Sequence, residues 1–369
     1  MTDRAPVAHQ VEGDFGKSVE GFDVRKTSLE PTSADLGTAR TPVDRFFVCN
    51  AGAAARVDAG AWRLRIDGDA AGAPVLLTFE QIAELPFVEV DAWLECAGNG
   101  RRLYEHVGGH ARPASAQDTH WMIGAMGMAR WGGVRLADLI ALAQPVDDLA
   151  WVSPAGLDVD NEDGEAVRMC LPAAKALDPD TLLAVEMNGS PLSAAHGAPA
   201  RLLVPGWIGA YSVKWIDRIE LSTSWIPSFR ADVYYRRRDP DGTDRGPATV
   251  HPVKSTLALA WEAEIPPGLT TLTGYARSGA APITRVEWSL DDGPWERAEL
   301  HPLTGRWAWT PFSLAVELGP GAHQIRTRAT DATGATQPDT TPYHPNTMLW
   351  NAITPHPLVV GQPKEPTRP

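Results

Sequence analysis

The chain has 369 residues, of which 43% are hydrophobic and 21% are charged, and its formal net charge is −13. This length and composition exclude a disordered chain and a single small core, and they favour two compact domains. The excess of acidic residues argues against a nonspecific nucleic-acid or anionic-membrane surface, so any basic site must be local. No run of about 18 continuous apolar residues occurs, and we therefore expect no membrane insertion.

The sequence has three cysteines, Cys49, Cys96 and Cys170. Their scattered spacing excludes a disulfide framework and a cluster of four thiolates, which is typical of proteins from a reducing compartment. The first 15 residues lack the apolar run of a secretory signal, so we expect a cytoplasmic protein. Each thiol then needs an explanation of its own.

Residues 1–41 are polar and contain several glycines, so they predict an arm on the surface, with the core beginning near Phe46. Thr78 is followed three residues later by Gln81, which predicts a capping box at the start of a short helix that Pro86 ends.

From Val88 to Cys96, apolar and polar residues alternate, and this period of two predicts a strand that brings Cys96 to an interior or pocket face. Apolar residues at helical spacing over 136–143 predict a helix that stops at Pro145, and residues 182–185 and 202–204 read as short buried strands. Strands and helices are mixed without a regular βαβ alternation, and neither a GxGxxG loop nor a Walker loop occurs. This pattern favours an α+β domain.

Residues 226–252 are rich in proline and glycine and predict a linker. Beyond it the helical signal ends, and short alternating segments at 286–290, 307–309 and 325–329 are separated by turns. The last hundred or so residues therefore predict a small antiparallel sandwich of immunoglobulin-like type.

One segment stands out for its chemistry, the run from Glu95 to Arg102, which reads ECAGNGRR. A thiol at the end of a strand, followed by glycines and two guanidinium groups, is placed where the thiolate form is favoured, as in a metal ligand or a nucleophile. The alternative is that Cys96 is a small core residue, which is the commoner role of an isolated cysteine.

A second segment, residues 196–215, places His196, Arg201 and Lys214 around a glycine-rich turn beside a buried strand. Cationic side chains and free backbone N–H groups in this arrangement suit an anion such as a phosphate. A solvated loop with surface charges is the alternative, and the spacing does not separate the two.

These two segments, together with Phe46-Phe47-Val48, the stretch from Trp121 to Ala125 and Glu186-Met187-Asn188-Gly189, resemble the sulfite oxidase family of molybdenum enzymes over residues 42–361. The resemblance implies an α+β molybdopterin-binding catalytic domain at 42–240, followed by an immunoglobulin-like dimerisation domain at 250–361. Several separate motifs in the same order make this match more specific than any one of them.

The resemblance also implies roles for individual residues. Cys96 would be the thiolate ligand of molybdenum, whose remaining sulfur ligands come from one molybdopterin. The pterin and its phosphate would be held by Asn50, Asp158, His196, Arg201, Ser212 and Lys214. The substrate pocket would contain Arg101, Trp121 and Tyr235, with Tyr234 as the adjacent alternative.

At two positions the sequence departs from the pattern of the sulfite-oxidising members of the family. Cys49 and Thr310 stand where the resemblance implies arginines that bind the substrate. Each charge-assisted hydrogen bond to a guanidinium contributes about 1.5–3 kcal/mol, so their loss predicts weaker binding of sulfite. Cys49 itself is interpreted either as a redox-sensitive thiol beside the metal or as an apolar filler.

The resemblance thus implies a molybdenum oxidoreductase that transfers an oxygen atom to or from a small substrate. A nitrate or sulfoxide reductase on the same scaffold is one alternative, and a non-catalytic pterin-binding protein is another. The implied partners are an external electron carrier, since no CxxCH haem attachment occurs, and a second copy of the chain. Nucleic acid is not expected as a partner.

Overall fold

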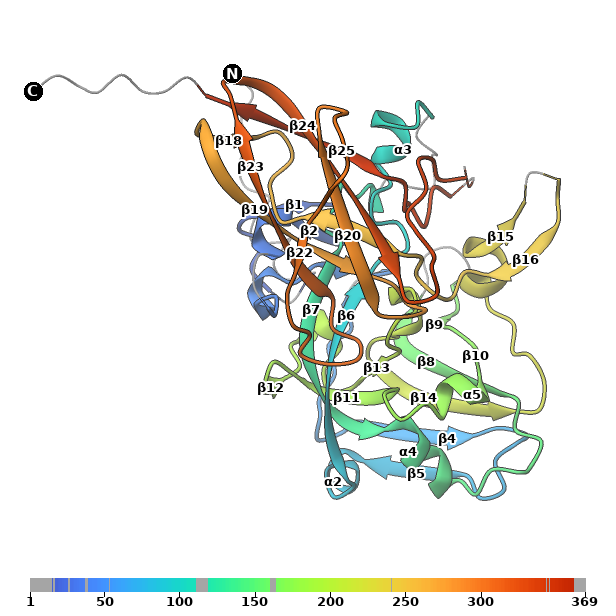
Figure 1. Cartoon of the computed structure of the whole chain (residues 1–369). Coiled ribbons are helices and arrows are strands. Elements are labelled where there is room, and N and C mark those ends of the chain that lie inside the picture. Colours follow the sequence, from blue (N-terminus) through green and yellow to red (C-terminus); the bar gives the residue numbers. More distant parts are fainter. Residues whose placement is uncertain are drawn as a thin grey trace, which may run out of the picture.

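The computed structural model describes residues 15–361 except 16, 26, 37, 38, 53, 111–118, 160–163, 240, 343 and 345. Most of the described secondary structure is strand, arranged in two parts (Figure 1). The lower part in that view contains the sheets built from residues 63–222, and the upper part contains two sheets built from residues 254–360. Residues 1–14 of the predicted arm lie outside the described residues.

One mixed sheet, in which β14 and β4 pair in parallel, and one antiparallel sheet form the first part and share one large apolar core. One sheet contains β4 (Arg63–Asp67), β5 (Val75–Thr78), β8 (Trp151–Val159), β9 (Ala166–Arg168), β10 (Leu171–Pro172) and β14 (Ile216–Ser222). The other contains β6 (Phe87–Glu95), β7 (Met126–Arg135), β11 (Leu182–Met187), β12 (Ser190–Pro191) and β13 (Arg201–Leu203). The α-helices of the described residues are short: α2 (Phe79–Ala83), α3 (Leu103–His106), α4 (Leu136–Leu142) and α5 (Ala173–Ala176). This α+β organisation is the predicted one.

The local predictions that rest on strong signals are confirmed. Thr78 accepts a hydrogen bond from the Gln81 amide and Gln81 reaches back to the Thr78 amide, so the capping box opens α2 as expected. Strand β6 ends at Glu95, directly before Cys96, and α4 ends before Pro145. In each case the residues that set the boundary act within a few positions of it, which is why the sequence suffices.

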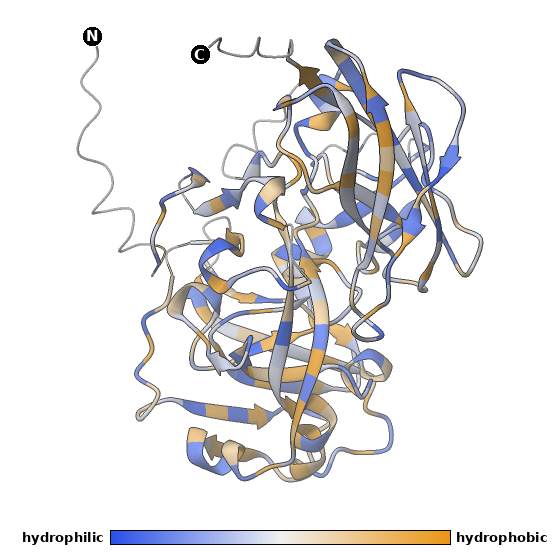
Figure 2. Cartoon of the chain, turned by 60° about the vertical axis from the view of Figure 1, so that its left-hand side comes forward, coloured by the Kyte–Doolittle hydropathy of each residue, from blue (hydrophilic) through white to orange (hydrophobic). Residues whose placement is uncertain are grey.

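The second part consists of two sheets around a core of its own. One contains β17 (Lys254–Leu257), β19 (Gly268–Arg277), β22 (Glu299–Leu300) and β23 (Thr310–Leu318). The other contains β18 (Ala263–Ile265), β20 (Ile283–Leu290), β21 (Glu296–Arg297), β24 (Gly321–Asp331) and β25 (Thr354–Val360). Hydrophobic and hydrophilic residues alternate along these strands, as a sheet with one covered face requires (Figure 2).

Two details of this sandwich differ from the prediction. Strand β18 pairs with β25 in parallel, because most of the domain intervenes between them and no hairpin constrains their direction. Residues 307–309 form no strand: Trp307 bridges to Ala92 of β6, and Trp309 is buried in a stack with Tyr275. The alternating tryptophans therefore mark tertiary contacts. The immunoglobulin-like strand order stays a prediction.

The predicted surface arm is wrong for residues 27–31, which are buried, whereas the described residues among 17–25 are exposed or half-buried. Strands β1 (Phe22–Val24), β2 (Ser28–Pro31) and β3 (Val48–Cys49) form a sheet in which β2 is the central strand. All four residues of β2 are buried, and Leu29 packs in a cluster with Phe15, Val48 and Ala195. The short polar sequence does not indicate this role, because β2 is buried by the strands on either side of it and not by an apolar pattern of its own.

We predict that Leu29→Ala lowers the free energy of unfolding by about 2–5 kcal/mol, the usual cost of removing a fully buried leucine side chain. Leu269→Ala, at a side chain that is 75% exposed, is the matched control and should change it by less than about 0.5 kcal/mol. Chemical unfolding followed by tryptophan fluorescence measures both. Equal effects of the two substitutions would show that residues 27–31 do not belong to the core.

Candidate functional site

A deep pocket opens in the first part of the structure, with about 1010 Å³ of space that is partly open to solvent. Its walls come from segments far apart in the sequence, between Phe46 and Tyr235. Nine residues predicted for the site line it: Cys49, Asn50, Cys96, Arg101, Asp158, His196, Arg201, Ser212 and Lys214. Both candidate tyrosines, Tyr234 and Tyr235, line it too. The fold thus brings together the two segments that the sequence singled out.

Cys96 lies in the wall of this pocket, in the turn that follows β6. Its amide donates to Ala125 O at 3.0 Å, and the Trp121 indole Nε1 donates to its Sγ at 3.2 Å. A hydrogen bond from Cys49, the Arg101 charge and the indole lower the pKa of the Cys96 thiol to about 7, against the opposing effect of burial. The site therefore favours a thiolate, the form that binds a soft metal.

Cys49 faces the same space from the end of β3. Its hydrogen bond to Cys96 and its burial raise its pKa well above the usual value, so Cys49 remains a thiol and donates to the Cys96 thiolate. Trp121 does not line the pocket but acts on it through Cys96. The Arg25 guanidinium lies over the Trp121 ring at 5.2 Å, so the N-terminal segment helps to hold this indole.

Arg101 is held in place by four protein acceptors. Its Nε donates to Thr347 O at 3.2 Å, its Nη1 to the carbonyl and hydroxyl of Thr119, and its Nη2 to the Tyr234 hydroxyl at 3.4 Å. The guanidinium lies over Gly98, where an added Cβ would come within 2.8 Å of its Cζ. Glycine at that position lets the cation lie close beside the Cys96 turn, which is what the ECAGNG segment contributes.

The two neighbouring tyrosines share this side of the pocket, with ring centroids 4.9 Å apart. Tyr234 contacts Arg101, whereas Tyr235 is buried and experiences the charge of the Cys96 thiolate. Burial and that thiolate hold the pKa of Tyr235 well above its usual value. Tyr235 therefore stays a phenol that can donate a hydrogen bond into the pocket.

Arg230 is a pocket residue that the sequence analysis missed. It lies at the start of a π-helical turn, η6 (Arg230–Tyr234), with its guanidinium carbon 5.0 Å from the centre of the Tyr234 ring. Its positive charge lowers the pKa of both Cys49 and Tyr235, although other effects dominate there. Arg230 lies in the predicted linker, where no periodic pattern of apolar residues indicated a structured turn. Such single π-turns are frequent at functional sites.

The pocket wall also carries a cluster of cationic side chains, the buried Arg201 and the half-buried Lys214. Arg201 Nη2 donates to Ser212 O at 2.8 Å, and Ser212 Oγ accepts from the Val204 amide at 3.1 Å. Lys214 Nζ donates to Asn50 Oδ1 and to Ala195 O. The His196 ring packs edge-on against Phe46. Backbone carbonyls and one amide thus fix the positions of these two cations, and Asp158 is a carboxylate whose charge acts on Lys214.

Burial makes these charges costly. Desolvation and the neighbouring Arg201 lower the pKa of Lys214 to about 7, although Asp158 opposes the shift. Desolvation lowers the pKa of Arg201 to about 9. It also lowers the pKa of His196 well below its usual value, helped by nearby Lys17 and Lys214. A bound dianion would relieve both the desolvation and the mutual repulsion, so the donor set fits a phosphate.

The residues also fit molybdopterin as a whole. Among the described residues, no group of three His, Cys, Asp or Glu side chains is arranged to hold a metal ion. A metal bound by the Cys96 thiolate would therefore take its other ligands from an organic group, for which the pocket has room between Cys96 and the cation cluster. Thr310, in contrast, does not line the pocket: it lies in β23 and pairs with Ala276.

Comparisons with known families agree with this geometry. The family model "Oxidoreductase molybdopterin binding domain" matches residues 51–230, and "Mo-co oxidoreductase dimerisation domain" matches residues 250–354. No described helix is both long enough and apolar enough to cross a membrane.

Similar proteins include the sulfite oxidase of Gallus gallus, 34% identical over 95% of this chain and 79% of its own length. Human mitochondrial sulfite oxidase is 32% identical over 84% of this chain, which spans 58% of that protein. The NADH nitrate reductase of Ulva prolifera is 31% identical over 84% of this chain and 39% of its own length. Among solved structures, the sulfane dehydrogenase SoxCD from Paracoccus pantotrophus superposes with a TM-score of 0.79 at 27% identity, covering 95% of this chain and 89% of its own.

We predict that sulfate, as a mimic of the cofactor phosphate, stabilises the cofactor-free protein more at about pH 6 than at about pH 8, because Lys214 loses its proton as the pH rises through about 7. Thermal unfolding with and without sulfate measures the effect. Lys214→Met should give a smaller and pH-independent stabilisation. A wild-type protein that gains as much from sulfate at both pH values would contradict this assignment.

Proposed function

Because this chain belongs to the sulfite oxidase family of molybdopterin-dependent oxidoreductases, we propose that it oxidises a small sulfur-containing anion by oxygen-atom transfer, with Cys96 as the protein ligand of molybdenum. The observation that carries the proposal is the Cys96 thiolate in the wall of a pocket that also presents Arg101 and Arg230. Sulfur chemistry is favoured because the sulfite oxidases and the sulfane dehydrogenase are similar over most of this chain.

Molybdopterin-bound molybdenum supplies two-electron redox chemistry and transfer of an oxygen atom. The chain supplies the surroundings. Lys214, Arg201 and the neutral His196 would hold the phosphate of the cofactor, and Asn50, Asp158 and Ser212 line the same pocket. These groups are fixed before the cofactor arrives, so binding needs little reorganisation.

On the substrate side, two guanidinium groups attract the anion while Tyr235 donates a hydrogen bond to it. Arg101 is immobilised by Thr119, Thr347 and Tyr234, which keeps its charge in one position. Donors held in place in this way stabilise charge that develops on the substrate without moving during the reaction. Hydrogen bonds from Cys49 and, to a smaller extent, from the Trp121 indole favour the thiolate form of Cys96 beside this site.

Cys49 occupies the wall where the resemblance implies a substrate arginine, and we propose that Arg230 replaces the lost charge from another element. Its place on η6 brings the cation close enough to affect the pKa of Cys49. The substrate side of the pocket thus presents two arginines, Arg101 and Arg230, beside the Cys49 thiol. Because Thr310 lies outside the pocket wall, we assign it no part in substrate binding.

Nitrate reduction is the second candidate function. The nitrate reductase of Ulva prolifera is similar over 84% of this chain, and nitrate is also a small oxyanion that the two arginines would accept. For partners, we propose an external electron carrier and a homodimer; the match to the dimerisation domain over residues 250–354 supports the homodimer.

The first test is metal binding and turnover. The purified protein should contain molybdenum and pterin and oxidise sulfite or thiosulfate with ferricyanide as acceptor, whereas Cys96→Ser should lose the sulfur-to-molybdenum absorption and at least about 100-fold in activity. Cys170→Ser, at a buried cysteine outside the pocket, is the matched control. If the protein turned over only nitrate, with a reduced viologen dye as electron donor, nitrate reduction would be its reaction and the proposed oxidation would be wrong.

The second test concerns the arginine on η6. Arg230→Met should raise KM for the anionic substrate by about 10- to 100-fold, the range expected for one charge-assisted hydrogen bond. Arg238→Met, at an exposed arginine of the neighbouring strand β15 (Arg236–Arg238), should leave KM unchanged. Adding Cys49→Arg to the Arg230→Met variant should restore part of the affinity. A wild-type KM in Arg230→Met would show that this cation does not meet the substrate.

A further inference from the structure

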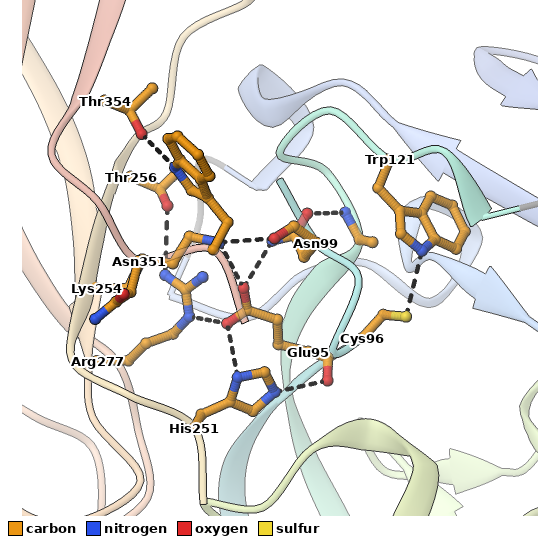
Figure 3. Close-up of polar contacts among 12 residues, drawn as sticks. Glu95, Cys96, Asn99, Trp121, His251, Lys254, Thr256, Arg277, Asn351 and Thr354 are labelled. Atoms are coloured by element: carbon orange, nitrogen blue, oxygen red, sulfur yellow. Dashed lines mark hydrogen bonds and ion pairs between the residues drawn. The ribbon is translucent and has the colours of Figure 1, made fainter. Parts of the chain in front are cut away.

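A buried group of charges joins the two parts of the structure directly behind the candidate metal ligand (Figure 3). Glu95 belongs to β6, while Lys254, Arg277 and His251 belong to the segment that contains the C-terminal sandwich. The exposed fraction of these residues lies between 1% and 5%. We call these four residues the Glu95 cluster.

Both oxygens of the Glu95 carboxylate are held by cations from the sandwich. Lys254 Nζ donates to Oε1 at 3.0 Å, and Arg277 Nε donates to Oε2. Burial alone would raise the pKa of Glu95, but Arg277 and Lys254 hold it well below its usual range, so the carboxylate is ionised. A buried carboxylate needs such partners, because an unpaired charge in the interior is strongly destabilising.

The same contacts reach the backbone on both sides of Cys96. His251 Nε2 donates to the Glu95 carbonyl at 3.0 Å, and Lys254 Nζ donates to the Asn99 carbonyl at 3.1 Å. Asn99 in turn donates from Nδ2 to Glu95 Oε1 at 2.8 Å and accepts from the Ala125 amide at 3.1 Å. The turn that carries Cys96 is therefore bound at both of its ends.

Alternation along the strand explains why this cluster can act on the site without lining it. Glu95 and Cys96 are consecutive, so their side chains point to opposite sides, the thiol towards the pocket and Trp121, and the carboxylate towards the sandwich (Figure 3). A third contact supports the turn from the same part of the chain, since the Leu349 amide donates to Ala97 O at 2.7 Å.

The cluster also carries charge. Burial lowers the pKa of His251, which is therefore neutral, and one carboxylate faces two cations, so the cluster has one excess positive charge. The Cys96 thiolate and Lys254 attract one another electrostatically. A buried positive charge close to a thiolate ligand stabilises the more electron-rich state of that ligand and its metal.

We propose that Lys254 and Arg277 are positioning residues for the metal ligand: through Glu95 and Asn99 they fix the Cys96 turn, and their excess charge tunes the metal that Cys96 binds. The inference rests on the proposed role of Cys96. It makes the C-terminal part of the chain, whose described residues do not line the pocket, a contributor to the metal site.

The test compares two substitutions in the molybdenum-loaded protein. Lys254→Met removes the contacts to Glu95 and Asn99 and one positive charge, whereas the double variant Glu95→Gln with Lys254→Met removes the same contacts but keeps the net charge of the cluster. We expect the sulfur-to-molybdenum absorption band to shift in both variants, because the cysteine is no longer held in one orientation. The reduction potential of the metal should fall in Lys254→Met alone, and kcat should fall by about tenfold or more in both.

Arg306→Met is the matched control, because Arg306 also joins the two parts, through Asp180 at 3.1 Å, but its neighbour Trp307 bridges to Ala92 and not to the Cys96 turn, and its own side chain is 61% exposed. It should leave the band and the potential unchanged. Thermal unfolding identifies a variant that fails to fold. Arg277→Lys, which keeps a positive charge beside the Glu95 carboxylate, then takes the place of that variant, and we expect the same shift of the absorption band.

The outcomes separate the inference from the function on which it rests. Wild-type absorption in Lys254→Met and in the double variant, with the absorption lost in Cys96→Ser, overturns the positioning role and leaves the proposed metal ligand in place. Retention of the absorption in Cys96→Ser overturns the ligand assignment itself. A band that shifts equally in Arg306→Met overturns the inference too, because any contact between the two parts would then suffice.

Discussion

A thiolate can be kept in a protein interior only if hydrogen bonds and positive charge replace the water that it loses, and this requirement organises the site. The Cys96 sulfur receives hydrogen bonds from Trp121 and Cys49 and lies near Arg101. Each of these groups comes from a different segment, and each is itself held by contacts to other segments. Contacts from the N-terminal sheet and from the Thr347 carbonyl thereby hold the groups that surround one sulfur atom in the turn after β6.

The cation cluster of the pocket obeys the same electrostatic rule with the signs reversed. The buried Arg201 and the half-buried Lys214 both have lowered pKa values, and a bound anion would relieve the cost of their charges. A pocket whose wall carries both a thiolate and a cation cluster is complementary to a ligand that carries both a metal and a phosphate. This complementarity belongs to the folded protein before any cofactor binds.

The relation between the two parts of the chain follows from β6. Its pocket face carries Cys96 onward from Leu94, and its other face presents Asp91, Trp93 and Glu95 to the rest of the structure. The ring of Trp93 meets that of His251, and its amide donates to the Trp307 carbonyl. The half of β6 from Asp91 to Glu95 is buried, and Trp93 and Glu95 contact the C-terminal part of the chain. On this face Glu95 pairs with the buried cations Lys254 and Arg277.

The sequence by itself determined what depends on neighbours a few positions away: the α2 capping box, the strand that ends at Cys96, the α+β class and the two segments that meet in the pocket. Only the tertiary structure decided the central place of β2, the role of Trp307, the position of Arg230 in the pocket wall and the pairing of Glu95 with Lys254 and Arg277. Those features join residues as far apart in the sequence as Ala92 and Trp307, and no local period encodes which distant side chain will cover a given face. Burial and charge compensation, which select these partners, exist only once the chain has folded.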